Sequence, residues 1–363
     1  MRGTASRRPA LSAFLLALAL TFGMSAGGMG IAVMLMGGPA AAQRVVEQPR
    51  NAGSLNGADE WRMIRHGAEG DVSIPNKMAG LLIQPGQTFR EWHNGPLTRW
   101  GAIVEIAVVA LLAIFFVIRG RMRLHGGWSG RTVVRFNEFE RFIHWLVAGS
   151  FVVLALSGLN MLYGRYVIRP LVGAYAFSSL TELGKWLHNY LAFAFVIGVV
   201  LMFLMWVKDN LPTRADWIWL KEGGGMFTKG KSEPPAWKFN AGQKILFWLI
   251  LLGGISVTLS GVALLFPFTF HWFSMTFSFV DLFGFHLPTN LTPIAEAQLS
   301  ELWHAAVGLM FIAVIIAHIY LGTIGMEGAF DAMASGKVDA NWAKEHHPLW
   351  AATLDDGTSG SDD

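Results

Sequence analysis

The chain has 363 residues, 53% of them apolar and 15% charged, and its mean hydropathy of +0.42 is that of an integral membrane protein rather than a water-soluble enzyme. Cysteine is absent, which excludes cysteine-bound iron–sulfur clusters, thiolate-bound haem and covalently attached c-type haem, so any electron carrier must be held by histidine or methionine. The net charge of +3 is small and no basic cluster has a nucleic-acid-binding pattern, so we expect no nucleic-acid partner.

Residues 1–42 have the pattern of a secretory signal peptide. Three arginines within the first eight residues precede a long apolar segment, which ends in Ala40-Ala41-Ala42. A basic start, an apolar centre and a small-residue end are typical of such signals, and we expect cleavage after Ala42. The apolar segment is longer than in most signals, so an uncleaved spanning helix is the alternative. Both interpretations place the polar residues 43–98 outside the membrane, as an extension that covers a partner or the core.

Five apolar segments follow, each close to the ~20 residues that an α-helix needs to cross a bilayer. They cover residues 99–118, 143–163, 187–207, 245–266 and 302–324. The pattern predicts an all-α membrane protein, with a four-helix core at 143–324 and one extra N-terminal transmembrane helix at 99–118. External loops are expected at 164–186 and at 267–300. The second of these loops is rich in aromatic residues, which is typical of segments at the membrane interface or under a partner.

The distribution of lysine and arginine predicts which helix ends face the cytoplasm. The loop at 119–142 carries six arginines and the loop at 208–244 carries six lysines and one arginine, whereas 267–302 contains neither residue. Because cytoplasmic loops carry an excess of positive charge, we expect these two loops and the tail at 325–363 to be cytoplasmic. The extension at 43–98 is then periplasmic, and the topology is that of a multi-pass protein of the bacterial inner membrane.

Four histidines in the predicted spans fall at two depths. His304 and His318 are fourteen residues apart in the last span, so on one helix they lie ~21 Å apart and within ~40° of the same face. The topology places His188 and His304 near the outer membrane face, and His144 and His318 near the inner face. Two helices can therefore hold one metal ion at each depth, in the bis-histidine arrangement of a b-type haem. Small residues that leave room for a flat macrocycle occur at Gly158, Gly261 and Gly308.

Other roles for histidine lead to different expectations. A single histidine in a span is as often a helix–helix hydrogen bonder or an interfacial residue as a ligand. Two depth-matched pairs in a chain without thiols favour haem, and zinc would need more closely spaced ligands. We expect the remaining seven histidines to lie in polar segments or loops, the last two solvated in the tail: His66, His93, His125, His271, His286, His346 and His347.

A second candidate site directly precedes the fourth span on the cytoplasmic side. It is Phe239-Asn240-Ala241-Gly242-Gln243-Lys244. Asn240 and Gln243 can donate and accept hydrogen bonds, Gly242 permits close approach, and Lys244 supplies a charge at the headgroup level. Such a set could hold a quinone carbonyl next to the inner histidine pair. The alternative is a helix start with Asn240 as N-cap and Gln243 completing a capping pattern. Spacing alone favours the cap, and the two roles are compatible.

Several stretches between Arg135 and Trp350 carry a family resemblance. They are Arg135 to Trp145, Ala155-Leu-Ser-Gly-Leu159, Lys185-Trp-Leu-His188, Phe239 to Lys244, Trp303 to Gly308, Ala317-His-Ile-Tyr320, Gly336-Lys-Val338 and Trp342 to Pro348. Together they resemble the gamma subunit of membrane-bound respiratory formate dehydrogenase, a di-haem cytochrome b, over roughly three-fifths of the chain. The Asn-Ala-Gly-Gln-Lys motif at 240–244 is the most specific part. The histidine spacings alone would also suit hydrogenase cytochrome b subunits.

The resemblance implies a role for each candidate site residue. Carried over by position, His188 and His304 are the ligands of the outer haem iron, and His144 and His318 those of the inner haem iron. Asn240, Gly242 and the neighbourhood of His318 correspond to the quinone pocket, and Gln243 and Lys244 complete the candidate set.

The function implied by the resemblance is electron transfer, without bond chemistry on formate in this chain. Electrons would come from an iron–sulfur beta subunit, cross two haem b groups and reduce ubiquinone or menaquinone at the cytoplasmic side. Formate would be oxidised in an alpha subunit that holds molybdenum or tungsten outside the membrane. We therefore expect these two subunits, membrane lipid and quinone as partners, and no catalytic residue here. The leader, the span at 99–118 and the aromatic loop depart from the shorter family members.

Two alternatives lead to other functions. A cytochrome b subunit of a hydrogenase or of another membrane oxidoreductase would use the same haems with a different dehydrogenase. A transporter would need polar residues that line a path at mid-depth, and the predicted spans contain few of them, Glu105 being the exception.

Overall fold

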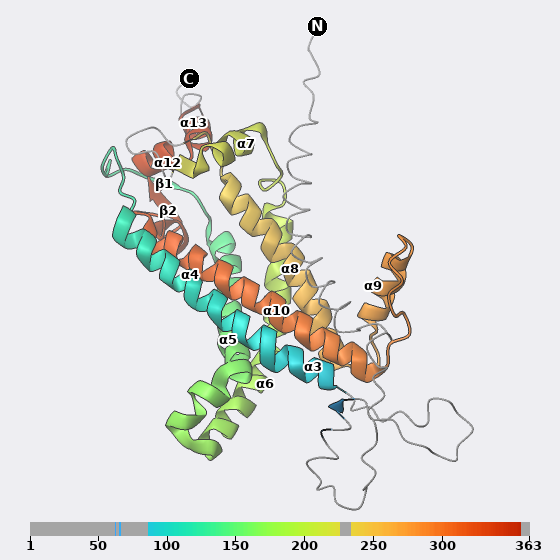
Figure 1. Ribbon diagram of the computed structural model, residues 1–363. Coiled ribbons are helices and arrows are strands. Elements are labelled where there is room, and N and C mark those ends of the chain that lie inside the picture. Colours follow the sequence, from blue (N-terminus) through green and yellow to red (C-terminus); the bar gives the residue numbers. More distant parts are fainter. Residues whose placement is uncertain (1–61, 63–64, 67–85, 226–233, 357–363) are drawn as a thin grey trace, which may run out of the picture. The chain divides into compact units, whose positions relative to one another are not determined.

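A computed structural model describes residues 62, 65–66, 86–225 and 234–356 (Figure 1). The predicted signal segment 1–42 and most of the predicted extension 43–98 lie outside the described residues. Within the described part, five helices are long and apolar enough to cross a membrane: Thr88–Arg119, Glu138–Val167, Arg169–Trp206, Ala241–Leu265 and Pro293–Gly325. The predicted all-α class and the five predicted spans are therefore confirmed.

The first span is built from three consecutive helical pieces, and the other spans are named α5, α6, α8 and α10. Their bounds are α3 (Gln87–Trp92), η2 (His93–Leu97), α4 (Thr98–Arg119), α5 (Glu138–Val167), α6 (Arg169–Trp206), α8 (Ala241–Leu265), α10 (Pro293–Tyr320) and η4 (Leu321–Gly325). Shorter elements connect and follow them: β1 (Thr132–Val134), α7 (Arg214–Lys221), η3 (Gly223–Gly225), α9 (Trp272–Asp281), α11 (Asp331–Ala334), β2 (Lys337–Asp339), α12 (Ala340–His346) and α13 (Pro348–Asp356).

The described residues divide into two units. The first, which we call the bundle unit, contains Trp100–Leu259 and residues 304–356. The second contains residues 86–99 and Ser260–Trp303. Each unit is described by itself below.

Four helices of the bundle unit share one apolar core. Val147 of α5, Phe195 and Val199 of α6, Leu251 of α8 and Phe311 of α10 form a single buried cluster. Gly198 lets α6 approach α5 closely, because a Cβ at this position would lie 2.8 Å from a methyl group of Val147. The burial of these side chains between four helices is the expected basis of the predicted four-helix core.

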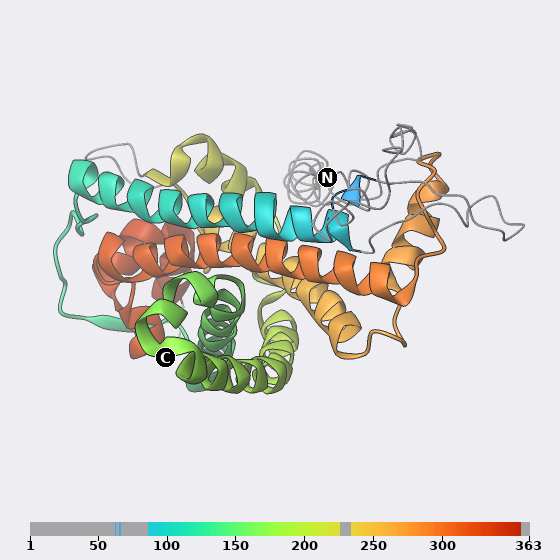
Figure 2. The ribbon, with the colours of Figure 1, turned by 60° about the horizontal axis from the view of Figure 1, so that its bottom comes forward.

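Helix α4 runs beside α10 within the bundle unit (Figure 2). A Cβ at Gly101 would lie 2.5 Å from Leu309, and the rings of Phe115 and Phe116 meet Tyr320 edge-on, each at 6.4 Å between centroids. The opposite side of α4 leaves large apolar residues exposed, such as Val117 at 83%. A surface of this kind is stable against lipid rather than water.

The prediction of an external loop at 164–186 is wrong. Helix α6 begins at Arg169 and continues through Trp206, with a break at Gly173, where φ is 82° and ψ is 169°. Helix α10 likewise begins at Pro293, well before the apolar run that contains His304. Hydropathy detects only the part of a helix that matches the membrane, so helical ends that carry polar residues were read as loops. His188 and His304 consequently lie inside long helices.

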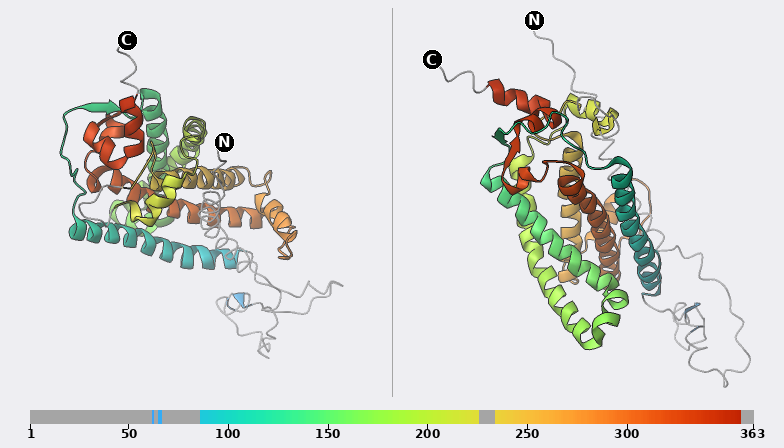
Figure 3. Two further views of the ribbon diagram at one scale, coloured as in Figure 1. Left: turned by 90° about the horizontal axis from the view of Figure 1, so that it is seen from above. Right: turned by 90° about the vertical axis from the view of Figure 1, so that its left-hand side faces the viewer.

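The tail after 325 folds back onto the loop between α4 and α5. Strand β1 pairs antiparallel with β2, from Thr132 opposite Asp339 to Val134 opposite Lys337, and Met122 forms a parallel bridge with Met326. This small sheet and the helices α11 to α13 gather at one end of the bundle unit (Figure 3). The backbone partners are about 200 residues apart in sequence, so no local pattern could have predicted them.

A buried arginine joins the tail to the bundle. Nη2 of Arg135 donates to the Lys238 carbonyl at 2.7 Å and to Nε2 of His347 at 2.9 Å. Its guanidinium carbon lies 5.1 Å from the ring centroids of both Trp342 and Trp350. Burial lowers the pKa of Arg135 to about 9, although the nearby carboxylate of Glu140 acts in the opposite direction, and the residue remains charged at neutral pH.

The expectation that His346 and His347 are solvated is wrong. Their exposed fractions are 4% and 1%, because the tail packs them against the Arg135 cluster. Nδ1 of His347 donates to the Trp237 carbonyl at 2.6 Å, which makes Nε2 the acceptor for Arg135. Burial, and then the charge of Arg135, hold the pKa of His347 well below its ordinary value, so the imidazole is neutral.

Acid is expected to weaken the docking of the tail. The unfolded tail takes up a proton on His347 below the ordinary histidine pKa of about 6.5, whereas the folded tail does not. The stability is therefore present above about pH 6.5 and falls below it by about 1.4 kcal/mol per pH unit. Hydrogen exchange of residues 326–356 between about pH 5 and about pH 8 measures this effect. A His347→Gln variant should flatten the dependence; an equally steep one would assign it to other groups.

The second unit contains the predicted aromatic segment, which folds around a buried glutamate. Glu296 is 1% exposed and accepts hydrogen bonds from the backbone amides of Phe273 and Ser274, at 3.1 and 2.7 Å. It thereby satisfies the first amides of α9. Phe277 and Leu287 form the apolar core of this segment with Leu299.

Candidate functional site

Two of the four candidate histidines, His188 on α6 and His304 on α10, face each other inside the bundle unit. Their ring centroids are 6.0 Å apart and the rings are inclined by 61°. Nδ1 of His304 donates to the Val257 carbonyl of α8 at 3.0 Å. Nδ1 of His188 lies 2.9 Å from Oγ of Ser157 on α5. Four helices thus contribute to holding this pair.

The other two candidates, His144 on α5 and His318 on α10, form a second pair. Their ring centroids are 6.4 Å apart and the rings are inclined by 59°. His144 also meets the indole of its neighbour Trp145 edge-on, at 5.1 Å between centroids. The structure therefore brings together the same two pairs that the sequence predicted. Their roles as ligands are considered under the proposed function.

The spacing within each pair suits a single metal ion between two imidazoles. A bond from a first-row metal to an imidazole nitrogen is about 2 Å long, and the ring centroid lies about 1 Å behind that nitrogen, so two rings on one ion are about 6 Å apart. The observed 6.0 and 6.4 Å agree with this value. Two rings in direct contact can pack at other distances, whereas two imidazoles on opposite sides of one ion must lie about 6 Å apart.

Glycines leave room beside both histidines of α10. Gly308 follows His304 by one turn and Gly322 follows His318 by one turn, so each glycine lies on the ligand face. Apart from the adjoining residues and helix backbone, a Cβ at either position would meet no atom of the described residues within 4 Å. At Gly158, beside the first pair, a Cβ would lie 3.7 Å from Cε1 of His188. Open space next to opposed imidazoles fits a flat macrocycle.

The surroundings do not suit a zinc site. Within the described residues, no group of three or more His, Cys, Asp or Glu side chains could hold a metal ion. The histidines outside the pairs have other surroundings. His125 bonds Glu345 at 2.6 Å, and in the second unit His93 lies 3.5 Å from Glu301. Two isolated pairs with open space around them favour haem over a compact metal centre.

The predicted capping pattern at the second candidate site is present. Oδ1 of Asn240 accepts from the amide of Gln243 at 2.9 Å, and Oε1 of Gln243 accepts from the amide of Asn240 at 3.0 Å. This reciprocal pair starts α8. Because it uses only the side-chain oxygens, the amide nitrogens of both half-buried side chains can still donate to a ligand. Gly242 allows close packing, since a Cβ there would lie 3.0 Å from the indole of Trp219.

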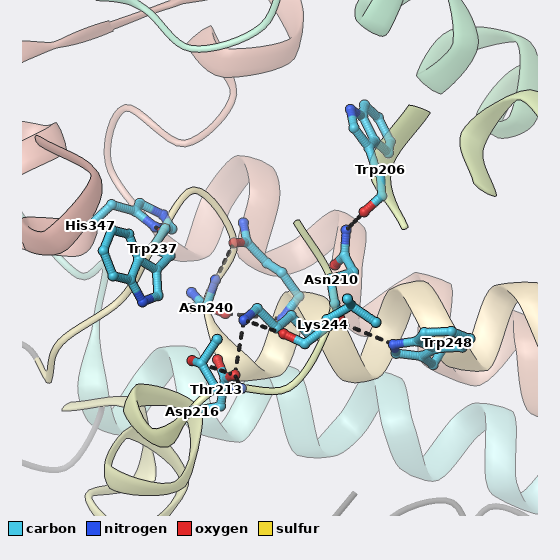
Figure 4. A network of polar contacts seen from close by, with 11 residues as sticks. Trp206, Asn210, Thr213, Asp216, Trp237, Asn240, Lys244, Trp248 and His347 are labelled. Carbon is cyan, nitrogen blue, oxygen red and sulfur yellow. Dashed lines mark hydrogen bonds and ion pairs between the residues drawn. The ribbon is translucent and has the colours of Figure 1, made fainter. Parts of the chain in front are cut away.

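Lys244 differs from the expectation that it supplies a charge at the headgroup level. It is 5% exposed, and its Nζ donates to the Leu211 carbonyl at 3.0 Å and pairs with Asp216 at 2.9 Å (Figure 4). Asp216 also accepts from the hydroxyl of Thr213 at 2.8 Å, as the cap of α7. Lys244 therefore ties α7 to α8. The sequence around Lys244 does not indicate that Asp216 is its partner.

Sequence reasoning also missed Ser157 and Glu140. Glu140 accepts from Asn137 as the cap of α5, and from Trp206 and Lys238 at 2.9 and 2.6 Å. The capping box of α5 was visible as Asn137 followed three residues later by glutamate. The contact between Ser157 and His188 was not visible, because it depends on how α5 and α6 pack.

An all-helical membrane bundle with opposed histidines on neighbouring helices defines the class of membrane-bound cytochromes b. The profile described as prokaryotic cytochrome b561 matches residues 135–336, and the chain belongs to this family. Its cofactor is therefore haem b, and it is a multi-pass membrane protein.

Curated relatives are subunits of formate dehydrogenases. The formate dehydrogenase, nitrate-inducible, cytochrome b556(Fdn) subunit of Escherichia coli is 28% identical over 224 residues, which cover 61% of this chain and 91% of the relative. The formate dehydrogenase, cytochrome b556(fdo) subunit of the same organism is 27% identical over 220 residues, covering 60% and 92%. The Haemophilus influenzae formate dehydrogenase, cytochrome b556 subunit is 23% identical over 221 residues, covering 60% and 82%. The resemblance predicted from the sequence motifs is confirmed.

Proposed function

We propose that this chain is the cytochrome b subunit of a membrane-bound formate dehydrogenase and that it carries electrons across the membrane to quinone. The observation that carries the proposal is the presence of two pairs of opposed histidines, with His304 and His318 on one helix. The names of the relatives support formate dehydrogenase over other dehydrogenases.

Each histidine pair would hold one haem b. His188 and His304 would hold the iron of the outer haem, and His144 and His318 that of the inner haem. Haem b, when bound, supplies one-electron transfer at its iron. The chain holds the two imidazoles of each pair from two different helices and leaves space for the macrocycle at Gly308 and Gly322.

The charge of the loops supports an orientation in the bacterial inner membrane. The loops at 119–142 and 208–244 are basic and would be cytoplasmic, the alternation of the spans puts the tail on the same side, and the first pair is then outward. Electrons would then enter at the outer pair from an iron–sulfur subunit, itself served by a molybdenum or tungsten subunit that oxidises formate. They would leave at the inner pair. Proton uptake with quinone reduction on that side would contribute to a proton-motive force.

The quinone site would be formed by Asn240, Gly242 and the neighbourhood of His318. The side-chain amides of Asn240 and Gln243 can donate to a quinone carbonyl while their oxygens cap α8. Lys244, which is paired with Asp216, would fix the position of the helix start rather than contact quinone. The capping and binding roles are thus compatible.

One experiment tests both the function and the pocket. In membranes that contain the assembled complex, formate should reduce two haem b groups per chain, and added quinone should reoxidise them. In Asn240→Ala, formate should still reduce the haems, but reoxidation should slow about tenfold, because one hydrogen bond to a carbonyl is worth about 1.5 kcal/mol. Asn137→Ala is the matched control, since it removes the same kind of cap from α5.

The outcomes separate the alternatives. Haem that is reduced by hydrogen and not by formate would assign the chain to a hydrogenase. If haem reoxidation slows equally in the Asn137 and Asn240 variants, Asn240 acts only as a helix cap and does not bind quinone. A preparation without haem b absorbance would refute the whole proposal and reopen the transporter interpretation.

A further inference from the structure

The hydrogen bonds of the outer pair define which imidazole nitrogen carries the proton. Oγ of Ser157 donates its only proton within α5, to the carbonyls of Val153 at 2.7 Å and Leu154 at 3.0 Å. It can therefore only accept from Nδ1 of His188, 2.9 Å away. The partner of His304 is the Val257 carbonyl, which also only accepts. Both rings of this pair carry the proton on Nδ1, so that the lone pair lies on Nε2.

In the inner pair, one ring lacks a hydrogen bond from Nδ1. Nδ1 of His144 is buried and has no hydrogen-bond partner among the described residues. The two pairs are otherwise alike in centroid distance and ring inclination. The hydrogen bonding of Nδ1 is therefore what distinguishes them.

A hydrogen bond donated by the distal nitrogen makes an imidazole a more basic ligand. A more basic ligand stabilises ferric over ferrous iron, and this lowers the reduction potential of the haem. An outer haem with two such ligands would then have a lower potential than an inner haem in which His144 lacks the bond.

We propose that Ser157 is a positioning residue that lowers the reduction potential of the outer haem by accepting a hydrogen bond from His188. The asymmetry between the pairs thereby makes electron transfer from the outer to the inner haem favourable. This inference rests on the proposed function, since it requires a haem at each pair. It adds the cause of the direction of electron flow, which ligand positions alone do not supply.

Redox titration of the haem b absorbance in the purified full-length chain, with its partner subunits, tests the inference. We expect two midpoint potentials in the unchanged protein. Ser157→Ala should shift the lower potential upwards and leave the upper one in place. The shift should be partial, because the Leu154 carbonyl is a second acceptor near the same ring. Ser157→Thr keeps the hydroxyl and should restore the original value.

The matched control is Ser150→Ala. Ser150 lies on the same helix, is buried, and donates to the carbonyls of Leu146 and Val147 in the same way, at 2.6 and 3.1 Å. No hydrogen bond joins it to a histidine among the described residues, so both potentials should remain unchanged. Repeating the titration with His318→Ala, which is expected to retain only the outer haem, assigns the shifted potential to that haem.

The outcomes are distinct from those of the proposed function. Loss of the haem spectrum from the unchanged protein would overturn the function, whereas two haems with unaltered potentials in Ser157→Ala would overturn only this inference. If Ser157→Ala loses a haem, Ser157→Cys is titrated instead, because a thiol has a similar size but is a weak acceptor. An upward shift of the lower potential would support the inference, and two unaltered potentials would overturn it. An equal shift in Ser150→Ala would attribute the effect to general loosening of α5 and would also overturn the inference.

Discussion

His318→Ala is expected to leave one haem b per chain and to abolish quinone reduction by the complex. The variant removes one of two opposed ligands at the inner pair, where the rings of His144 and His318 are 6.4 Å apart. A single imidazole cannot replace the missing bond, and the quinone site would lose both its electron donor and a neighbouring residue. Formate should still reduce the remaining haem, since the outer pair is untouched.

Pyridine haemochrome spectra and quinol formation with formate as donor measure these effects. His304→Ala should also leave one haem, but formate should then fail to reduce it, because the entry point is lost. His125→Ala is the control, because its side chain is 53% exposed, pairs with Glu345 and belongs to neither histidine pair. Two haems per chain in His318→Ala would contradict the assignment of His318.

Arg135→Leu is expected to release the tail from the bundle. The substitution removes two hydrogen bonds and the stacking on Trp342 and Trp350, and it leaves the Lys238 carbonyl and Nε2 of His347 buried without a donor. Hydrogen bonds to a charged group contribute about 1.5–3 kcal/mol, so we expect a loss of at least about 3 kcal/mol. Hydrogen exchange should accelerate by more than about a hundredfold across residues 326–356.

Arg141→Leu is the matched control for this effect. Arg141 also donates to carbonyls of the tail, those of Met333 and Ala334, but one of these bonds is exposed to solvent. Its loss should cost less than about 1 kcal/mol. Similar acceleration in both variants would show that any contact to the tail suffices, and would contradict a special role for Arg135.

The histidine pairing was predictable because it depends on two regular quantities. The rise of a helix sets the distance between His304 and His318, and loop charge sets the depth at which each span begins. The helical rise and the loop charge both depend on local sequence, and neither changes with the way the helices pack. The family motifs then supplied the cytochrome b assignment, which the matched profile confirms.

The unpredicted features all depend on contacts between distant parts of the chain. The β1–β2 pair joins residues 132–134 to residues 337–339, and Lys244 finds its partner in Asp216 across a loop. Burial of His347 follows from the same folding of the tail. Neither hydropathy nor spacing contains information on such contacts, because each residue type would look the same on a solvated surface. The extended ends of α6 and α10 were missed because polar helical turns outside the membrane resemble loops.

Helix α10 supplies one histidine to each pair, and this has a consequence for biogenesis. His144 and His188 emerge early from the ribosome, on helices that can enter the membrane as a hairpin, but neither has its opposing ligand until the last span has been made. Under the proposed function, both haems would therefore be incorporated after insertion of that span. A chain that ends before residue 304 would offer each haem one imidazole only. Neither cofactor site would therefore be complete until the final helix has been synthesised.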